Sequence, residues 1–512
     1  MSKTISDDPN VITDEVRAAN GQAVSVKKIS KYDGTVLFEM DKEGMIPLID
    51  KIRIVDGTTY TSVQSAIDAL STPKVVFIPT STLTSIAAIS PKSGDSIIGA
   101  GTLSSILKLG ATSGQVHAIS LVNKSDVVLR DFQIDGQKAI QTFSNHNIYA
   151  IGSHDIRFRD IYSKDAYFDG VYLGHISVGP TYNAWLDNIH IEGAGRCGFG
   201  ITSGYNIWAR NIHSHGCGSN DPVAGMDIEP NDATDHAENI WIDNLYTHDN
   251  LGVGFSFLGH HDSYLTHGNL FMKNLHSYNN SGSGIALGDG HNLNFIGGVL
   301  RNNQDGFYCF STAHLKQIRL ARMNIHNNVS RGAGFITNGV IDVVNQDLSI
   351  TDCAIYNNGS YGLQIEGKSN TYPVRYVTIA NNRAYDDQAV PTQTYGIAAA
   401  AFVEYVNATD NITWGNKNAG VFIVGTGCVS RGNLPDNVSG SGMVPVTVGA
   451  SPFTWTNDAR PSAVYIAGGT VSRIERLFCG IGTSSPWSGV VPPYGQLIIT
   501  YSVLPEMWYE AV

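Results

Sequence analysis

Ten glycines recur along the chain, and each opens a short segment with apolar residues at the first and third following positions. They stand 22 to 34 residues apart, at Gly170, Gly198, Gly225, Gly254, Gly284, Gly306, Gly334, Gly362, Gly396 and Gly420. Self-similarity at such a period is typical of a solenoid, whose repeats bury their apolar faces against one another. Because the repeats alternate with period two and carry no helical pattern, each is predicted to form one turn of a parallel β-helix.

Each turn is predicted to contain three strands around a common core. The strand after the glycine places residues such as Val171 and Leu173 inside and the residue between them outside. A second strand, centred on Ile189 in one turn and commonly preceded by Asn, comes before the glycine, and a third precedes that strand. A structural ladder of stacked amide side chains is expected four residues before several glycines, at Asn250, Asn280, Asn302, Asn358 and Asn416.

Composition excludes several classes of partner. The chain has 33 Lys and Arg against 45 Asp and Glu, a net charge of −12, and no basic run, so neither nucleic acid nor a membrane surface is expected to bind. No segment reaches the ~18 consecutive apolar residues of a membrane span, and the first residues lack the apolar core of a signal peptide. The six cysteines form no CxxC pair and are expected to be buried free thiols, and no motif indicates a cofactor or a metal site.

The chain is predicted to be all-β and to have four parts. Residues 1–58 are polar and irregular and form an N-terminal attachment segment. Residues 59–119 hold an amphipathic helix at 60–70 and apolar strands at 75–79 and 96–101, and the helix is expected to cap the open first turn. The parallel β-helix solenoid occupies residues 120–434, and residues 435–512 form a small C-terminal β-domain with strands near 463–472 and 495–502.

Two stretches of the sequence resemble known families. The helix, followed by Val-Val-Phe-Ile-Pro and Ser-Ile-Ile-Gly-Ala-Gly, resembles the entrance of the right-handed parallel β-helix of the pectate lyase superfamily. The ending, over residues 464–474 and 490–512, is similar to the terminal domain of many bacteriophage tailspikes. The resemblance implies a virion protein, made in the host cytoplasm, that assembles as a homotrimer and attaches to the phage tail or baseplate through its N-terminus. It also implies that the protein binds and cleaves a bacterial surface polysaccharide.

One turn carries acids at both outward positions of its glycine-led strand, in the segment Gly-Met-Asp-Ile-Glu-Pro-Asn-Asp. Two residues along a strand span roughly 6.6 Å, so the carboxyl groups of Asp227 and Glu229 can lie about 5 to 9 Å apart, a range that covers both retaining and inverting glycosidases. These two residues are therefore predicted to be the catalytic acids. An ordinary solvated strand face and a calcium site that adds Asp232 are the alternatives.

The neighbouring turns strengthen the catalytic interpretation of the acid pair. Gly200 precedes Asp227 in the outward column and is expected to leave space there. On the other side, His260 is predicted to act as a catalytic positioning or proton-relay group, and His261 to contact substrate, because adjacent turns are about 4.8 Å apart. The residues predicted to bind substrate are Tyr172, Trp208, Trp241, His261 and Tyr308.

Two further outward columns are predicted. The first is aromatic and comprises Trp185, Trp208, Trp241, Phe271 and Phe295. It forms either a platform for sugar rings or a contact between chains, and burial between chains is favoured because a wet apolar stripe is a liability. The second contains histidines, and a hydrated or interchain polar ladder is favoured over a metal site because one stacked column faces one way: His190, His213, His215, His248 and His276.

The leading functional hypothesis is a tailspike depolymerase that hydrolyses glycosidic bonds in a capsular polysaccharide or O-antigen. A polysaccharide lyase is the enzymatic alternative, in which a His or Tyr removes a proton beside a uronate and a cation neutralises the carboxylate. The scarcity of Lys and Arg around the predicted groove argues against a lyase. A receptor-binding spike without catalysis is the alternative from another class. The C-terminal domain is predicted to align three chains during assembly.

Overall fold

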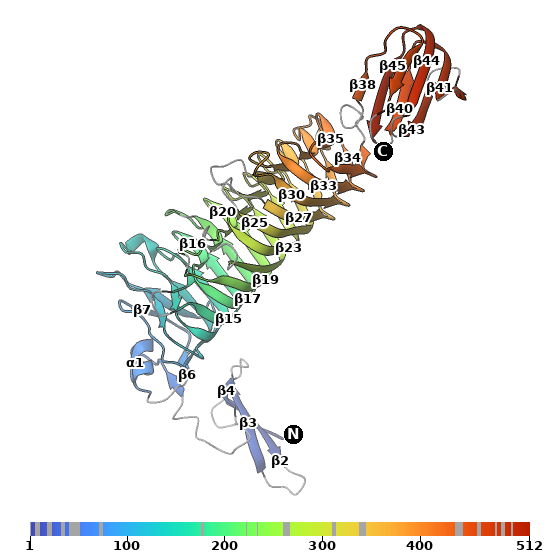
Figure 1. The fold of residues 1–512 in the computed structure, drawn as a ribbon. Helices are drawn as coiled ribbons and strands as arrows, with labels where there is room; N and C mark the ends of the chain where they lie inside the picture. Colours follow the sequence, from blue (N-terminus) through green and yellow to red (C-terminus); the bar gives the residue numbers. More distant parts are fainter. Residues whose placement is uncertain are drawn as a thin grey trace. The chain divides into compact units, whose positions relative to one another are not determined.

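The computed structural model divides the chain into two compact units, Met1–Gly252 with Thr266–Leu270, and Val253–Leu265 with Phe271–Val512 (Figure 1). The residues that it describes are 2–5, 11–17, 23–31, 36–39, 52–70, 75–175, 179–221, 223–232, 234–259, 267–309, 314–336, 345–435, 444–457, 462–476, 479–482, 487–492 and 495–511. Among these residues, no helix is both long enough and apolar enough to cross a membrane.

The N-terminal segment forms a small antiparallel sheet of four strands in the order β1-β2-β3-β4. This corrects the prediction of an irregular segment, because the short alternation in Ala-Val-Ser-Val-Lys-Lys-Ile is a strand pattern that the high polar content obscures. The strands are β1 (Ser2–Ile5), β2 (Val11–Arg17), β3 (Ala23–Lys31) and β4 (Val36–Glu39).

A single short helix, α1 (Val63–Asp68), precedes the solenoid, within the predicted range. A reciprocal capping box begins it, in which the Ser62 and Ser65 side chains each accept a hydrogen bond from the other residue's backbone N–H at 3.1 Å. At the other end, Lys92 Nζ donates to the Leu70 carbonyl at 2.7 Å. Parallel pairing connects the entrance strands: β5 (Ile52–Ile54), β6 (Val75–Ile78), β7 (Ser81–Ser85), β8 (Ser96–Gly99) and β9 (Ser105–Leu109).

In the first unit, each solenoid turn contributes one short and one long strand, and equivalent strands pair in parallel with their neighbours. The short strands form one sheet: β10 (Ile119–Val122), β12 (Ile148–Ile151), β14 (Val171–Gly174), β16 (Cys197–Ile201) and β18 (Ala224–Ile228). The long strands are β11 (Val128–Asp135), β13 (His154–Lys164), β15 (Thr181–Glu192), β17 (Gly204–His215) and β19 (Ala237–His248), and the one-turn 3₁₀ helix η2 (Lys138–Ile140) lies between β11 and β12.

Each long strand corresponds to the two pre-glycine strands of the prediction, joined at a corner. The corner is a single residue in the left-handed region, with φ of 55° at Asn188, 55° at Asn211 and 58° at Asn244. Asn adopts this conformation at low cost, which explains why Asn precedes the strand centres in the sequence. The chain therefore turns without leaving the parallel ladder.

The second unit repeats this plan. Its short strands are β20 (Val253–Phe257), β22 (Ile285–Leu287), β24 (Phe307–Cys309), β26 (Ala333–Ile336), β29 (Tyr361–Glu366), β32 (Tyr395–Ala399) and β35 (Ala419–Ile423). The strands before each glycine are β23 (Gly290–Arg301), β25 (Leu315–His326), β27 (Asn345–Thr351), β28 (Ala354–Tyr356), β30 (Val374–Ala380), β31 (Arg383–Tyr385), β33 (Val403–Thr409), β34 (Ile412–Trp414), β36 (Val429–Arg431) and β37 (Leu434–Pro435), and β21 (His267–Tyr278) carries residues of both units.

The register corrects the prediction at two positions. Ala333 pairs with Phe307, so Gly332 is the column glycine of that turn and Gly334 is an outward residue. A Cβ at Gly332 would lie 2.5 Å from the Gly362 carbonyl oxygen, a clash that glycine avoids. Phe295 is 1% exposed and packs on other core aromatics. Gly298, which follows the left-handed corner Gly297, stands where other turns have an apolar strand centre, so counting back from the next apolar residue reaches a core position.

The buried amide ladder of the second unit is present, with one predicted member replaced and two members added. Its side chains hydrogen-bond from turn to turn, for example from Asn328 Nδ2 to Asn358 Oδ1 at 3.0 Å. Asn303 occupies the position predicted for Asn302, which instead is a left-handed corner with φ of 54°. The continuous ladder is Asn280, Asn303, Asn328, Asn358, Gln393 and Asn416.

The C-terminal strands form two four-stranded antiparallel sheets, ordered β38-β45-β40-β43 and β39-β44-β41-β42. One apolar cluster, including Val464, Ile474 and Leu497, forms their core. The strands are β38 (Val444–Val446), β39 (Phe453–Thr456), β40 (Ser462–Ala467), β41 (Thr470–Arg476), β42 (Cys479–Gly482), β43 (Trp487–Val491), β44 (Gln496–Val503) and β45 (Glu506–Ala511). The small C-terminal β-domain of the prediction is therefore present.

Candidate functional site

The two acids predicted to be catalytic lie together on the outward side of β18 and its end. Asp227 is 4% exposed, Glu229 is half-buried, and the two carboxyl groups are hydrogen-bonded to one another. They are thus closer than the 5 to 9 Å range that strand spacing allows. Burial raises the pKa of Glu229, while its hydrogen bond with Asp227 and the charge of Arg196 oppose that rise, and two carboxyl groups in hydrogen-bond contact share one proton.

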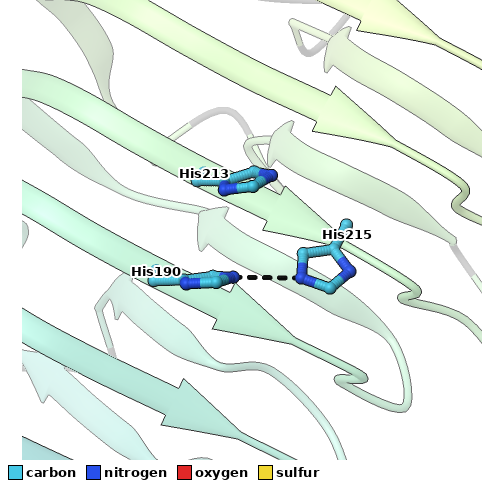
Figure 2. A group of neighbouring side chains, drawn as sticks. All are labelled: His190, His213 and His215. Carbon is cyan, nitrogen blue, oxygen red and sulfur yellow. Dashed lines mark hydrogen bonds between the residues drawn. The ribbon is translucent and has the colours of Figure 1, made fainter. Parts of the chain in front are cut away.

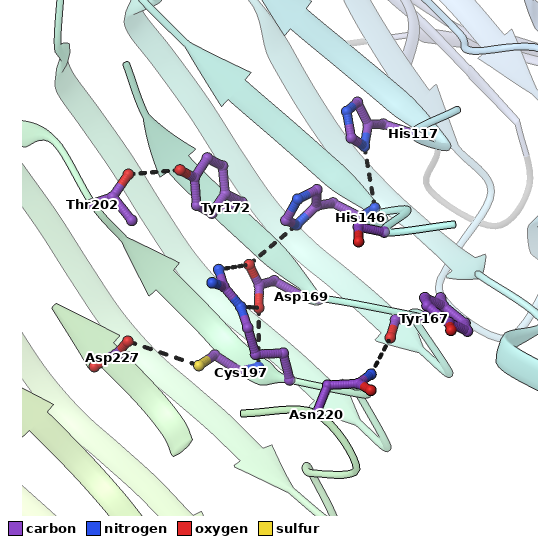
Figure 3. A network of polar contacts seen from close by, with 12 residues as sticks. His117, His146, Tyr167, Asp169, Tyr172, Cys197, Thr202, Asn220 and Asp227 are labelled. Carbon is purple, nitrogen blue, oxygen red and sulfur yellow. Dashed lines mark hydrogen bonds and ion pairs between the residues drawn. The ribbon is translucent and has the colours of Figure 1, made fainter. Parts of the chain in front are cut away.

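An ion pair lies beside the acids in the same sheet (Figure 3). The guanidinium of Arg196 donates two hydrogen bonds to the Asp169 carboxylate, from Nε to Oδ1 at 2.8 Å and from Nη2 to Oδ2 at 2.5 Å. The backbone N–H of Cys197 donates to the same carboxylate at 3.0 Å. Asp169 is fully buried, and burial alone would raise its pKa, but its contacts with His146 and Arg196 outweigh burial and lower that pKa to about 2.

His146 completes this network on the side of β12. Its Nδ1 lies 3.1 Å from Asp169 Oδ2, which is within ion-pair distance although the angle is not that of a hydrogen bond. The ring of His117 in the preceding turn lies 5.0 Å from that of His146. Burial and the neighbouring His146 lower the pKa of His117 to about 3, so its imidazole is neutral at physiological pH.

Stacked aromatic rings form a wall next to the ion pair. The ring centroid of Tyr149 lies 3.9 Å from that of His117 and 5.3 Å from that of Tyr172, and the two tyrosine rings are nearly parallel. Tyr172, predicted to bind substrate, also exchanges a 2.7 Å hydrogen bond with the Thr202 hydroxyl. Burial raises the pKa of both tyrosines, so their hydroxyl groups stay protonated and act as hydrogen-bond donors.

Gly200 lies between the stacked tyrosines and Asp227 and has no side chain. It pairs in register with Tyr172 on one side and Asp227 on the other. A Cβ there would lie 3.4 Å from Asp169 Oδ2 and 3.5 Å from a Tyr172 ring carbon, so any longer side chain would cover the ion pair and the ring.

Asp232 faces away from the acid pair and takes part in its own turn. Its Oδ1 accepts hydrogen bonds from the Thr234 N–H at 2.7 Å and the Thr234 hydroxyl at 2.6 Å, and these bonds lower the pKa of Asp232. Nearby, His175 is hydrogen-bonded to the buried Asp235. Asp227, Glu229 and Asp232 do not form a shared ligand cluster in the part of the chain that the structure describes.

The other residues predicted to contact substrate lie elsewhere or outside the described residues. His260 and His261 belong to the latter group. Trp208 and Trp241 belong to the long-strand sheet and not to the strand sheet of the acids, and their ring centroids stack 5.2 Å apart with Trp185 continuing the stack. Tyr308 lies on β24 of the second unit, where the guanidinium of Arg331 is 5.6 Å from its ring centroid.

The histidines of the first unit form two adjacent columns after the Asn corners, not a single column. His190 and His213 stack with ring centroids 4.6 Å apart, and His215 and His248 stack 4.9 Å apart in the next outward column (Figure 2 shows the first three). Burial, then the neighbouring imidazoles, lower the pKa of His213 to about 4. The expectation that stacked histidines all face one way does not hold here.

Sequence reasoning missed Asp169, Arg196, His146 and Tyr149. Asp169 stands immediately before Gly170, and Arg196 stands two residues before Gly198. The predicted columns begin at the glycine or at the Asn four residues before it, and they do not include the positions one and two residues before the glycine. His146 and Tyr149 lie in one turn that the glycine repeat does not include, because Asn147 stands there in the position of the repeating glycine. An outward Arg and Asp preceding adjacent column glycines was the available signal.

Comparisons with known proteins agree with the fold. Residues 264–434 match the family model for the right handed beta helix region. Among solved structures, the A-module of the mannuronan C-5 epimerase AlgE4 of Azotobacter vinelandii is 18% identical, with a TM-score of 0.50, and the match covers 73% of this chain and 95% of the module. The A-module of AlgE6 from the same organism is 15% identical, with a TM-score of 0.51, and the match covers 73% and 93%.

The Dettilon tailspike protein is also similar, at 12% identity and a TM-score of 0.45 over 90% of this chain and 95% of that one. No curated protein sequence matches the chain. At these identities, the likeness to solved structures concerns the fold alone. Together with the parallel strand order, the family match confirms the predicted right-handed parallel β-helix.

Proposed function

We propose that this protein is a phage tailspike that binds a bacterial surface polysaccharide and cleaves it by glycosidic hydrolysis. The observation that carries the proposal is the pair of carboxyl groups of Asp227 and Glu229, beside Gly200, which has no side chain, and a wall of stacked tyrosines. Two carboxyl groups of which one holds a proton are the machinery of glycosidic hydrolysis. The tailspike assignment rests on the resemblance of the C-terminal sequence, and with it come the homotrimer and tail attachment.

Glu229 is assigned as the general acid of the pair. Its pKa is raised by burial, and it is the more exposed of the two, so it can reach a glycosidic oxygen above the sheet. It gives its proton to the leaving oxygen as the bond to the anomeric carbon breaks, water adds to that carbon, and the proton that the water releases returns to the carboxyl pair. Asp227 lies beside the developing positive charge. Because the carboxyl groups are in contact without substrate, the entering sugar must separate them.

The residues around the pair position substrate and proton. Asp169 is too buried and too firmly held by Arg196 to reach a sugar, so it serves to fix the guanidinium close to both acids. Tyr149 and Tyr172 present flat rings of the kind that pack on sugar faces, and their protonated hydroxyl groups donate hydrogen bonds. The epimerase modules of the same fold are named for activity on mannuronan, which is also a polysaccharide.

Elimination at a uronate is the second candidate. A lyase needs a cation to neutralise the uronate carboxylate, and Arg196 is a cation beside the acid pair. A lyase also needs a base, and here burial raises the pKa of both tyrosines, which keeps them protonated. The charge of Arg196 is already matched by a bidentate carboxylate. Both observations favour hydrolysis.

The test is digestion of capsular polysaccharide and O-antigen from candidate hosts by the full-length protein, with new reducing ends and oligosaccharide size as readouts. The wild-type protein should release oligosaccharides, and Glu229→Gln should lower the rate by about 10²-fold or more. The matched control is Glu366→Gln, since Gln364 and Glu366 occupy the same positions after their column glycine. Equal rates in wild type and Glu229→Gln would contradict the catalytic pair. Binding without product would indicate a receptor-binding spike, and a conjugated double bond in the product would indicate a lyase.

A further inference from the structure

Four histidines from three successive turns meet at the end of the long strands in the first unit. His190 lies on β15, His213 and His215 on β17, and His248 on β19. Each imidazole is half-buried, and none belongs to the acid-pair site. Among the described residues, His190, His213 and His215 form the one group of three or more His, Cys, Asp or Glu side chains whose ligand atoms all lie within 4.8 Å of one another.

The nitrogens meet edge to edge across the two columns. Nε2 of His190 lies 3.0 Å from Nε2 of His215, as Figure 2 shows, and Nε2 of His213 lies 2.7 Å from Nε2 of His248. A zinc ion with Zn–N bonds of about 2.0–2.1 Å holds tetrahedral ligand atoms about 3.3 Å apart. To hold one ion, the two diagonal pairs must separate by a few tenths of an ångström, and the ligand atoms of His190, His213 and His215, which lie within 4.8 Å of one another, must come to the same spacing. Stacking alone orders rings face to face and does not aim nitrogens of different columns at each other.

Two carboxylates, those of Asp249 and Glu192, lie next to this histidine cluster. Nδ1 of His248 is 2.6 Å from Oδ2 of Asp249, which orients the ring and leaves Nε2 to act as an acceptor. Glu192 occupies the same outward column as His215 and His248 and is itself held by the Tyr162 hydroxyl. A ligating His that donates its other N–H to a carboxylate is the usual arrangement at metal centres.

We propose that His190, His213 and His215 bind one late first-row transition-metal ion, of which Zn²⁺ is the representative, with His248 as the fourth ligand. Imidazole suits Zn²⁺, Ni²⁺ and Cu²⁺ and does not suit Ca²⁺ or Mg²⁺, which take oxygen ligands. Because the ligands come from β15, β17 and β19, the ion joins three successive turns of the solenoid. The site is separate from the proposed hydrolysis, so each can fail without the other.

The test uses the full-length protein treated with chelator and dialysed, then titrated with Co²⁺ and Zn²⁺. One Co²⁺ per chain should bind with visible ligand-field absorption, and Zn²⁺ should displace it. Thermal unfolding should shift to higher temperature with Zn²⁺, because a ligand that binds the native state stabilises it by mass action. Sizing and circular dichroism verify that each variant is folded.

His213→Gln should weaken Zn²⁺ binding by about 10²-fold or more, and Asp249→Asn, at an outer-shell position, by about tenfold. The control is His326→Gln, a histidine at the same strand end in the second unit that stacks on Tyr356. It should bind Zn²⁺ as the wild type does. A wild-type protein that binds no stoichiometric Co²⁺ or Zn²⁺, or a folded His213→Gln protein with unchanged affinity, would overturn the proposal.

Discussion

The amide ladder of the second unit and the acid-pair site of the first are both stacks of polar side chains, one turn above another. In the ladder, each amide oxygen accepts from the preceding turn and each amide nitrogen donates to the next turn, so Asn358 has partners on both sides. The acid-pair site breaks this regularity. Successive outward positions there hold Tyr172, Gly200 and Asp227, which differ in size and charge.

The difference separates structure from chemistry in this solenoid. A column that repeats one neutral residue satisfies its own hydrogen bonds and requires nothing from a ligand. A column that changes residue at every turn has one position without a side chain, at Gly200, next to carboxyl groups that share a proton, and these are features that a ligand can use. Periodic columns are therefore expected to govern stability or assembly, and aperiodic ones activity.

The largest expected effect is on turnover. Asp227→Asn or Glu229→Gln should each lower the rate by about 10² to 10⁴-fold and leave unfolding by denaturant nearly unchanged. Because the two carboxyl groups act as one proton-sharing unit, the double variant should lose little more than the worse single variant. Steady-state rates of the three variants measure this, and losses that multiply would show that the acids act independently.

The second effect is on stability. Asn358→Ala removes an acceptor for Asn328 and a donor to Gln393 in a buried place, so it should cost about 3 kcal/mol of unfolding free energy. Activity per folded molecule should stay at the wild-type level. The control Asn418→Ala, at an exposed position, should change stability by less than about 0.5 kcal/mol. A large loss of activity in folded Asn358→Ala would break the division between the two kinds of column.

The tryptophan column extends the comparison to assembly. Trp185, Trp208 and Trp241 repeat one residue, with centroids 5.0 and 5.2 Å apart, so the column is predicted to be contact between chains. Trp208→Glu should weaken the proposed trimer by about 2 kcal/mol per chain, the value of burying a large apolar side chain. Light scattering should then detect a smaller species, while Leu103→Glu, at a side chain 82% exposed, leaves the size unchanged. An intact trimer that has lost sugar binding would support a sugar platform instead.

The smallest effect concerns acid stability. The pKa of Asp169 is lowered from 3.8 to about 2 in the folded chain, so its ionised form stabilises the fold above pH 3.8, and that contribution disappears as pH falls through about 2. The stability difference between wild type and Asp169→Asn should therefore be constant above about pH 4 and shrink by about 2 kcal/mol at lower pH. Denaturant unfolding at several pH values measures the difference. A gap that does not change with pH would contradict an ionised, paired Asp169.

The sequence predicted the solenoid well because its core residues repeat at nearly regular intervals. Residues that stack in the structure therefore appear at equivalent positions after successive glycines in the sequence. It failed at Gly332 and Phe295, because the column glycine of one turn stands two residues before Gly334, and Gly298 takes the place of an apolar strand centre in the other. For the site, the doubled acids and Tyr172 stood out as departures from the repeat. Asp169 and Arg196 did not, because contacts between turns 27 residues apart depend on how loops are folded.

Digestion of the host polysaccharide in ¹⁸O-labelled water, followed by mass spectrometry of the products, tests the central claim most directly. Hydrolysis adds one water oxygen to each new reducing end, whereas elimination adds none. Wild-type protein and Glu366→Gln should give oligosaccharides that carry one ¹⁸O each, and Glu229→Gln should give almost no product. Unlabelled products, or labelled products formed equally fast by Glu229→Gln, would contradict hydrolysis by the Asp227 and Glu229 pair.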